Sequence, residues 1–354
     1  MSGPARERET DPDPQELGRV DELLASTRGL RDGAVVGVTA AGRSRVWHRG
    51  PLPDGAASVF EIGSVTKTFT ALLLADLARE GIVGLDDPVA AYLPVAPPVL
   101  GRPITLADLA THHSGLPRLP AGMTGPSLSG TARSVDRRDP YAHLDEDALV
   151  DAIRRTSPTR PPGERFGYSN LGAGLLGWAL ARRLSTTYAA LVAQRVTGPL
   201  GLADTWIDPP TGAAWRVATG HGWWGREAHP WDLAGLVGAG GLRSTAADLL
   251  AYLAVFAEGA TGPLAAAAAE ARRPRHRVGE LEVGLGWLRT TPTGRASGRL
   301  GVREPVLFHD GGTGGFRSFA ALVPATGTAV VVLSARARGV TGTGLRVLAA
   351  AAGD

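Results

Sequence analysis

Apolar residues recur along the first quarter of the chain with two periodicities, one typical of helices and one typical of strands. Residues 14–28 carry apolar positions at helical spacing, whereas 34–40 and 45–48 flank a tight turn as two antiparallel strands would. A short strand at 58–61 then leads into residues 69–78. Because this last stretch is apolar on nearly every face, it predicts a buried central helix.

The middle of the chain, residues 85–235, shows few strand signals. Helices are predicted over 105–111, 144–155, 171–184 and 187–196. Between the first two of these helices, residues 116–143 are rich in Pro, Gly, Ser and Arg. A connection of that length is typical of a functional lid, so we expect this loop to cover an active site.

Strand patterns return in the last third of the chain. Strands are predicted over 283–290, 306–309, 315–323 and 328–334, and helices over 246–256 and 345–351. Both ends of the chain therefore carry strands, which predicts one sheet built from both. We expect a discontinuous α/β domain (14–84 and 236–354), an inserted all-α domain (85–235) and a disordered tail (1–13).

Composition excludes several classes of protein. The chain has no cysteine, which rules out disulfides and thiolate chemistry. Its net charge is only +3, and no basic stripe is interleaved with aromatic residues, so we expect no nucleic-acid partner. Neither a signal peptide nor a run long enough to span a bilayer is visible. We therefore expect a cytoplasmic protein without a membrane partner.

One basic residue differs from all the others. Lys67 is the only lysine, and the remaining basic residues are arginines. A guanidinium stays charged, whereas an ammonium that loses its water can release a proton and become a base. Ser64 lies three residues earlier, and on a helix such residues share a face, with β-carbons about 5–6 Å apart. An alcohol and a potential base are therefore neighbours.

The position of this pair at a helix start adds a third element. Free N–H groups and the positive end of the helix dipole would stabilise a negative oxygen that forms near Ser64. An isolated Ser-x-x-Lys is more often a helix cap whose lysine reaches solvent. Two further motifs favour the catalytic interpretation.

The second motif contains Tyr168 and Asn170, two residues apart in a turn that opens a helix. Asn170 is the only asparagine of the chain. A phenol near an ammonium can be ionised and act as a base or relay, and a carboxamide offers both a donor and an acceptor. The alternative, an asparagine cap beside a packed tyrosine, is commoner in isolation, but Lys67 needs such a partner.

The third motif is the glycine-rich stretch 308–316, which follows a strand. Glycines permit close approach of a ligand, and a main-chain N–H there could donate to an oxyanion. A phosphate loop is excluded because no Gly-Lys-Ser/Thr follows. Residues 167–171 do not match the Gly-x-Ser-x-Gly nucleophile motif of other serine hydrolases, because Leu171 occupies the position of its last glycine. The histidines lack metal-binding spacing, so no metal or cofactor is expected, and His112 and His113 are expected to support a loop beneath the site.

Taken in order, Ser64 to Lys67, Tyr168 to Asn170 and His309 to Gly311 resemble the motifs of the serine β-lactamase and penicillin-binding superfamily. Within it, the chain is most similar to the class C β-lactamase and family VIII esterase branch, from about residue 15 to its end. The supporting segments are 84–88, 104–117, 240–245 and 284–287. The resemblance implies an antiparallel sheet flanked by helices, an inserted helical domain and a site between the two.

The resemblance also implies roles for the motif residues. Ser64 would be acylated, and Lys67 and Tyr168 would share its proton, with the first acceptor left open. Asn170 would orient the substrate, while the N–H groups of Ser64 and Gly312 would form the oxyanion hole. The other substrate-binding positions implied are His309, Gly311 and Gly312.

One position departs from the usual family pattern. The lactamases and peptidases of this group usually begin the third motif with lysine, whereas this chain has His309, as many esterase-like members do. A neutral histidine holds a substrate carboxylate less strongly than a lysine does. We therefore expect a serine hydrolase that acts on a small carboxylic ester, or a related amide or lactone.

Two other functions stay open. The first is a β-lactamase or D-amino-acid peptidase, and the second is a non-catalytic ligand-binding relative, against which the three intact motifs argue. The loop 116–143 is expected to set acyl-chain preference if the chain is an esterase. The sequence predicts no oligomeric state.

Overall fold

A computed structural model of the protein describes most of the chain. The described residues are 14–27, 30–123, 138–291, 302 and 304–352. The tail predicted for 1–13 and residues 124–137 of the predicted lid lie outside these ranges.

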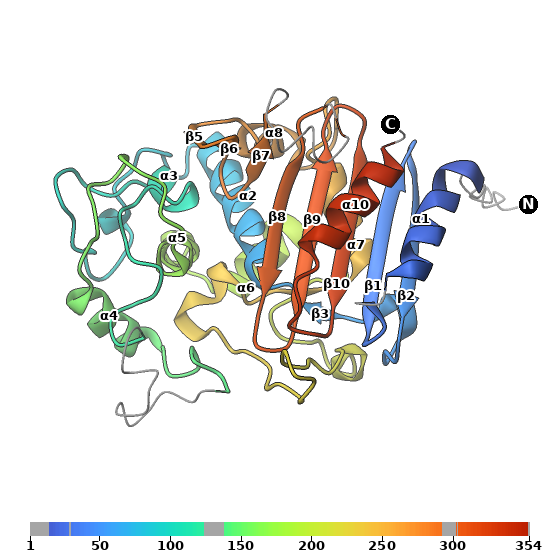
Figure 1. Ribbon diagram of the computed structural model, residues 1–354. Helices are drawn as coiled ribbons and strands as arrows, with labels where there is room; N and C mark the ends of the chain where they lie inside the picture. Colours follow the sequence, from blue (N-terminus) through green and yellow to red (C-terminus); the bar gives the residue numbers. More distant parts are fainter. Residues whose placement is uncertain (1–13, 28–29, 124–137, 292–301, 303, 353–354) are drawn as a thin grey trace, which may run out of the picture.

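An eight-stranded sheet forms the centre of the fold, in the order β2-β1-β10-β9-β8-β7-β6-β5 (Figure 1). Every neighbouring pair of strands is antiparallel. The strands are β1 (Ala34–Ala40), β2 (Arg43–Arg49), β5 (His276–Val278), β6 (Leu281–Val283), β7 (Leu288–Thr290), β8 (Leu307–Gly312), β9 (Arg317–Val323) and β10 (Thr328–Ser334). Since β1 pairs with β10, the prediction of one sheet built from both ends of the chain is confirmed.

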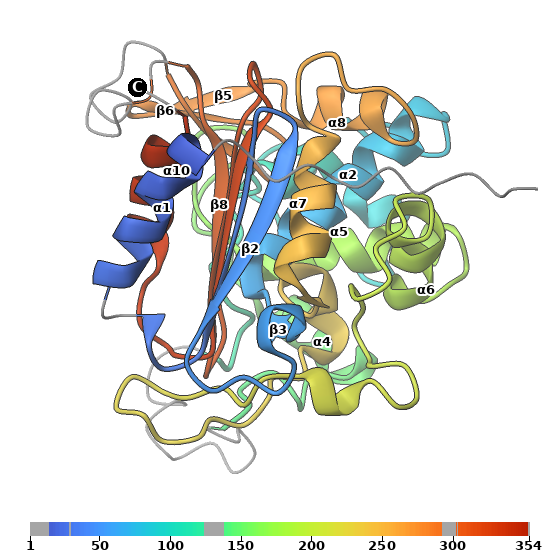
Figure 2. The same cartoon turned by 90° about the vertical axis from the view of Figure 1, so that its right-hand side faces the viewer.

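Helices cover both faces of this sheet (Figure 2). On one face lie α1 (Pro14–Ser26) and α10 (Thr341–Ala351), and on the other lie α2 (Thr66–Arg79), α7 (Ala246–Ala254) and α8 (Ala265–Ala271). The side chains of β10 alternate between the two layers: Val330 and Val332 join the α1 and α10 core, whereas Val331 and Leu333 join the core of α2 and α7. A strand buried on both faces explains why its sequence is continuously apolar.

A block of helices stands beside the sheet (Figure 1). It contains α3 (Leu106–Ala110), α4 (Glu146–Arg155), α5 (Asn170–Arg183) and α6 (Tyr188–Val192), which continues into a π-helical turn at Ala193–Thr197. The buried helix predicted over 69–78 is α2, whose neighbours include α3, α5 and α6 as well as α8. It therefore connects the helical block to the sheet. The residue limits given above for the two domains stay a prediction.

The predicted elements differ from the structure in several places. The strand β8 extends to Gly312, beyond the predicted end at 309, and α8 and β5 lie where no helix or strand was predicted. The single strand expected over 283–290 is a hairpin of β6 and β7, because the chain turns at Gly286, where φ is +68° and an added Cβ would lie 2.7 Å from Ala71 Cβ. The last helix begins at Thr341 instead of 345. Among the helices of the described ranges, none combines the length and hydropathy needed to cross a membrane.

Candidate active site

Ser64 lies in a 3-10 turn, Gly63–Val65, that connects the short strand β3 (Phe60–Glu61) to α2. Two glycines let the end of β8 lie against this turn. Gly63 has φ of +50°, and an added Cβ would lie 2.5 Å from Gly312 N; a Cβ on Gly311 would lie 2.1 Å from Ile62 O. No larger residue fits either position without backbone movement. The main-chain N–H groups of Ser64 and Gly312 are therefore on adjoining backbones.

Lys67 lies in the first turn of α2 and is 3% exposed. Its Nζ donates to Ser64 Oγ at 3.0 Å and to the Ala239 carbonyl at 2.6 Å. The pKa of Lys67 is lowered to about 7, chiefly by burial and also by the charge of Arg118, while the charge of Asp310 opposes this shift. A substantial fraction of the amine is therefore neutral near pH 7 and can accept the hydroxyl proton of Ser64.

Tyr168 precedes α5 and faces the same amine. Lys67 Nζ lies 5.0 Å from the centroid of its ring. Burial raises the pKa of Tyr168 above its ordinary value, and the Ser64 side chain and Arg118 only partly offset this. The lysine therefore does not produce a phenolate in the free protein, contrary to the possibility raised by the sequence. The electrostatics favour Lys67 as first proton acceptor and Tyr168 as a protonated donor.

Asn170 is the first residue of α5, but it does not cap the helix. Ser169 is the cap, since its hydroxyl accepts from Gly172 N at 2.9 Å. Asn170 Nδ2 donates to Tyr141 Oη at 3.1 Å, whereas Asn170 Oδ1 is buried and has no partner among the described residues. The capping alternative for Asn170 is therefore wrong, and one amide atom stays available.

His309 lies on β8 and is 4% exposed. Its Nδ1 donates to the Asp310 carbonyl at 2.6 Å. Burial, followed by the charge of Lys67, lowers the pKa of His309 to about 4, so the ring is neutral. The cleft is lined by Asp310, Gly311 and Gly312 of the same strand but not by His309. His309 lies behind the wall of the cleft, with its ring centroid 6.4 Å from that of Tyr168, so its contact with a substrate stays a prediction.

His112 and His113 hold the segment that carries Tyr168. Ser169 N donates to His112 Nδ1 at 3.2 Å, and Gly163 N donates to the His113 carbonyl at 2.7 Å. Burial lowers the pKa of both histidines. Their position agrees with the expectation that they support a loop beneath the site. Within the ranges that the structure describes, no cluster of three or more His, Asp or Glu residues is arranged to hold a metal.

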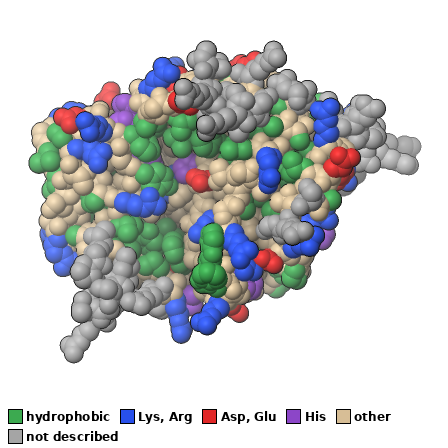
Figure 3. All heavy atoms as spheres, viewed as in Figure 1, with side chains coloured by type: hydrophobic (Ala, Val, Ile, Leu, Met, Phe, Trp, Pro, Cys, Tyr) green, Lys and Arg blue, Asp and Glu red, His purple; other side chains and the backbone are tan. Residues whose placement is uncertain are grey.

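A cleft of about 440 Å³ opens above Ser64 and Tyr168. Two arginines that the sequence reasoning missed, Arg118 and Arg317, also line it. Lys or Arg side chains stand on both sides of the hollow near the centre of Figure 3. Arg118 Cζ lies 5.1 Å from the ring centroid of Tyr168. Arg317 Nη1 donates to the carbonyls of Thr313 and Phe316.

Neither arginine forms an ion pair with a carboxylate among the described residues, although Asp310 in the same cleft interacts electrostatically with Arg317. Both guanidiniums stay charged at neutral pH. They are therefore available to an anionic group of a bound molecule. Strand register offered one signal for Arg317, because it pairs with Gly312 across β8 and β9.

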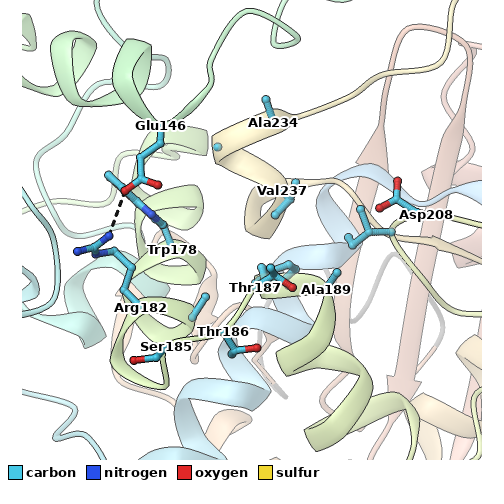
Figure 4. Close-up of a pocket in the computed structure, with 14 residues that line it drawn as sticks. Glu146, Trp178, Arg182, Ser185, Thr186, Thr187, Ala189, Asp208, Ala234 and Val237 are labelled. Atoms are coloured by element: carbon cyan, nitrogen blue, oxygen red, sulfur yellow. Dashed lines mark hydrogen bonds and ion pairs between the residues drawn. The ribbon is translucent and has the colours of Figure 1, made fainter.

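A larger hollow of about 580 Å³ lies between α5, α6 and the 3-10 segment η8 (Ala234–Ala239), and we call it the α5–α6 groove (Figure 4). Its apolar lining includes Trp178 and Val237, and Arg182 donates to Glu146 at 3.0 Å across its rim. None of the predicted site residues lines it. The segment η8 extends from the groove to the catalytic amine, since the carbonyl of Ala239 accepts the hydrogen bond of Lys67.

Comparisons with known proteins agree with this arrangement. A family model described as Beta-lactamase matches residues 19–353. The D-alanyl-D-alanine-carboxypeptidase/endopeptidase AmpH of Escherichia coli (strain K12) is 29% identical over 287 residues, which cover 75% of this chain and 68% of AmpH. A beta-lactamase of Pseudomonas fluorescens is 27% identical over 301 residues, 78% of this chain and 79% of that protein.

Solved structures show the same similarity. The crystal structure of a class C beta lactamase from Rhodobacter sphaeroides has a TM-score of 0.74 and 28% sequence identity, over 95% of this chain and 97% of that one. The predicted fold, an antiparallel sheet with flanking helices of the β-lactamase and transpeptidase type, is confirmed.

Proposed function

Because the chain belongs to the beta-lactamase family of serine hydrolases, we propose that it hydrolyses a small carboxylic ester, or a related amide or lactone, through an acyl-enzyme on Ser64. One observation carries the proposal: a buried amine whose pKa is lowered to about 7 lies 3.0 Å from the Ser64 hydroxyl oxygen. A base of that pKa is half neutral at pH 7 and still basic enough to take a proton.

Acylation follows from the positions of these groups. Lys67 accepts the hydroxyl proton as Ser64 Oγ attacks the carbonyl carbon of the substrate. The N–H groups of Ser64 and Gly312 stabilise the oxyanion that forms, an effect for which a single donor is worth about 10²–10³ in rate. The tetrahedral intermediate then collapses and the bond from the carbonyl carbon to the leaving group breaks. The proton that Lys67 took reaches the leaving group through the Tyr168 hydroxyl, and the acyl group stays on Ser64.

The charge of the cleft supports a substrate with an anionic group. Arg118 and Arg317 flank Ser64 without forming ion pairs to carboxylates among the described residues, so a carboxylate on the substrate would have two charged donors. His309 is buried and neutral where the family usually places a lysine, so a substrate carboxylate would be held by the two arginines and not by the third motif. Together these features favour a substrate that carries a carboxylate.

A second candidate is a peptidase or lactamase activity. AmpH is named a D-alanyl-D-alanine-carboxypeptidase/endopeptidase, and the Pseudomonas fluorescens relative is named a beta-lactamase. The same two arginines would serve a peptide or lactam carboxylate equally well. Parallel assays with short p-nitrophenyl esters and a chromogenic cephalosporin separate the two candidates. We expect faster ester turnover, and faster lactam turnover would overturn the choice of substrate.

A labelling experiment tests the chemistry apart from the substrate. A fluorophosphonate probe should modify the wild-type protein at Ser64 and leave Ser64→Ala unmodified. Equal labelling of both proteins would contradict the acyl-enzyme and favour a ligand-binding relative without catalysis.

A further inference from the structure

A small hollow lies directly beside Ser64. Its volume is about 20 Å³, and it is bounded by Ser64 and Gly312 on the side of the sheet and by Tyr141, Asn170 and Trp231 on the side of the helical block. A single water needs a cavity of about 10–15 Å³ and two to four polar partners. The space therefore has the size of one water and is too small for a substrate group of several atoms. We call it the water chamber.

The chamber has unused polar atoms in its wall. Asn170 Oδ1 and Thr313 Oγ1 are both buried, and neither has a hydrogen-bond partner among the described residues. Tyr141 Oη accepts from Asn170 Nδ2 at 3.1 Å, and as a hydroxyl it can also donate. An apolar cavity of this size would stay empty, whereas one with a carboxamide and two hydroxyls holds water.

Thr313 has a second polar neighbour. Burial raises the pKa of Glu61, and a side-chain hydrogen bond with Thr313 partly offsets this. Neither Glu61 Oε2 nor Thr313 Oγ1 has a well-aligned hydrogen-bond partner among the described residues. The Thr313 hydroxyl therefore lies beside a buried carboxyl group as well as in the wall of the chamber.

Two buried carboxylates fix the aromatic walls of the chamber. Trp231 N donates to Glu61 Oε1 at 3.0 Å, and Tyr141 N donates to Asp139 Oδ1 at 3.1 Å. The other oxygen of Asp139 accepts from Asp232 N at 2.5 Å. Both carboxylates are 4% exposed, and the rings of Tyr141 and Trp231 lie 5.4 Å apart. The chamber is therefore held in shape from outside.

We propose that the water chamber holds the water that hydrolyses the acyl-enzyme, with Tyr141 and Thr313 as positioning residues for deacylation. This inference rests on the proposed acyl-enzyme at Ser64. The carbonyl carbon of that ester is attached to Ser64 Oγ, which is itself part of the chamber wall. Ala239, whose carbonyl accepts from Lys67 Nζ, lines the chamber as well. A water there is beside the Ser64 side chain that carries the ester, and both Ser64 and Ala239 in the chamber wall are hydrogen-bonded to the Lys67 amine.

The deacylation step balances with groups already present. The water oxygen forms a bond to the ester carbonyl carbon, and its proton moves to the neutral amine of Lys67. The oxyanion collapses, the bond from carbon to Ser64 Oγ breaks, and Lys67 returns the proton to Oγ. The products are a carboxylic acid and free Ser64. No other reactant is needed.

The test uses full-length Tyr141→Phe and Thr313→Val with p-nitrophenyl acetate, an activated ester for which deacylation limits turnover. We expect kcat to fall about tenfold to a hundredfold with KM falling in parallel, so that kcat/KM is unchanged. The acyl-enzyme should accumulate, seen as a larger burst and as the added acyl mass on the intact protein. Thr313→Ser keeps the hydroxyl and should behave as wild type.

A matched control removes a phenol elsewhere. Tyr92 Oη donates to Asp87 and lines neither the cleft nor the chamber, so Tyr92→Phe should leave kcat and KM unchanged. Tyr141→Phe and Thr313→Val test the inference independently. Either variant is a valid test if it keeps the melting temperature of the wild-type protein.

Two results would overturn the inference. A fall in kcat/KM without accumulation of acyl-enzyme would show that the chamber orients substrate, and unchanged kinetics in both variants would show that it has no role. A wild-type protein that is never acylated would instead refute the proposed function, so the two failures are distinguishable.

Discussion

Two hollows of this molecule, the α5–α6 groove and the cleft above Ser64, differ in how their polar groups are paired. The α5–α6 groove is the larger, at about 580 Å³ against about 440 Å³ for the cleft. In the groove, Arg182 and Glu146 pair with each other at the rim. In the cleft, Arg118 and Arg317 form no ion pair with a carboxylate among the described residues, and the pKa of Lys67 is lowered to about 7.

The presence of unpaired polar groups distinguishes the hollow that we assign to catalysis from the one that we do not. Buried polar groups are normally paired, because an unpaired one costs free energy. The molecule keeps the low-pKa amine of Lys67 and the unpaired Asn170 Oδ1 within one small region around Ser64. A larger hollow without such groups can be part of ordinary packing.

Exchanging lysine for arginine near Ser64, and arginine for lysine in the groove, should produce the largest difference in ester turnover between the two hollows. Lys67→Arg keeps the positive charge but cannot accept a proton, so we expect ester turnover to fall about a thousandfold or more while the fold stays intact. The reverse exchange in the groove, Arg182→Lys, is the matched control and should change turnover less than about twofold. Initial rates with circular dichroism check both, and near-normal activity of Lys67→Arg would contradict its assignment as base.

Removing the unpaired charges should have the next largest effect. For Arg317→Gln we expect kcat/KM to fall about tenfold to a hundredfold with an ester that carries a carboxylate, since a hydrogen bond to a charged group is worth about 1.5–3 kcal/mol. With a neutral ester of the same size the change should be small, and Arg182→Gln in the groove should affect neither ester. An equal loss with both esters would mean that Arg317 does not recognise charge.

The pH dependence of the rate should show the lowered pKa of Lys67. Only the neutral amine accepts a proton, so kcat/KM should rise with pH through about 7 and then level off. Arg118 lowers this pKa, and Arg118→Gln should therefore move the midpoint to higher pH. A rate that stays constant down to pH 5 would be inconsistent with a lysine base.

The smallest effect is expected in the groove itself. Glu146 and Arg182 are 57% and 43% exposed, and exposed ion pairs contribute about 0–1 kcal/mol. Glu146→Gln should therefore change the free energy of unfolding by less than about 1 kcal/mol and leave turnover unchanged. Urea unfolding and initial rates measure the two quantities. A large loss of turnover in Glu146→Gln would show that the α5–α6 groove also takes part in catalysis.

Local patterns were sufficient to predict much of this molecule. The period of the apolar residues predicted β1, β9, β10 and the buried helix α2, because strands and helices bury faces at fixed spacing. The single lysine pointed to the pair of Ser64 and Lys67, since three residues of helix suffice to bring the two side chains together. The cytoplasmic location stays a prediction.

The missed features depend on contacts between distant segments. Arg118 and Arg317 meet at the cleft only because the helical block lies beside β8 and β9, and no local period reports that. The burial of His309, which removes it from the cleft, depends in the same way on packing across the sheet. Tyr141 lies at the end of the predicted lid, where composition suggested only a long loop.

The most direct test of the account uses the fact that the protein has one lysine. Protein labelled with ¹³C at the lysine ε-carbon gives a single side-chain resonance, whose chemical shift can be followed with pH by NMR. The account predicts a titration midpoint near pH 7 for Lys67, and a midpoint near the ordinary lysine value of 10.5 would contradict it.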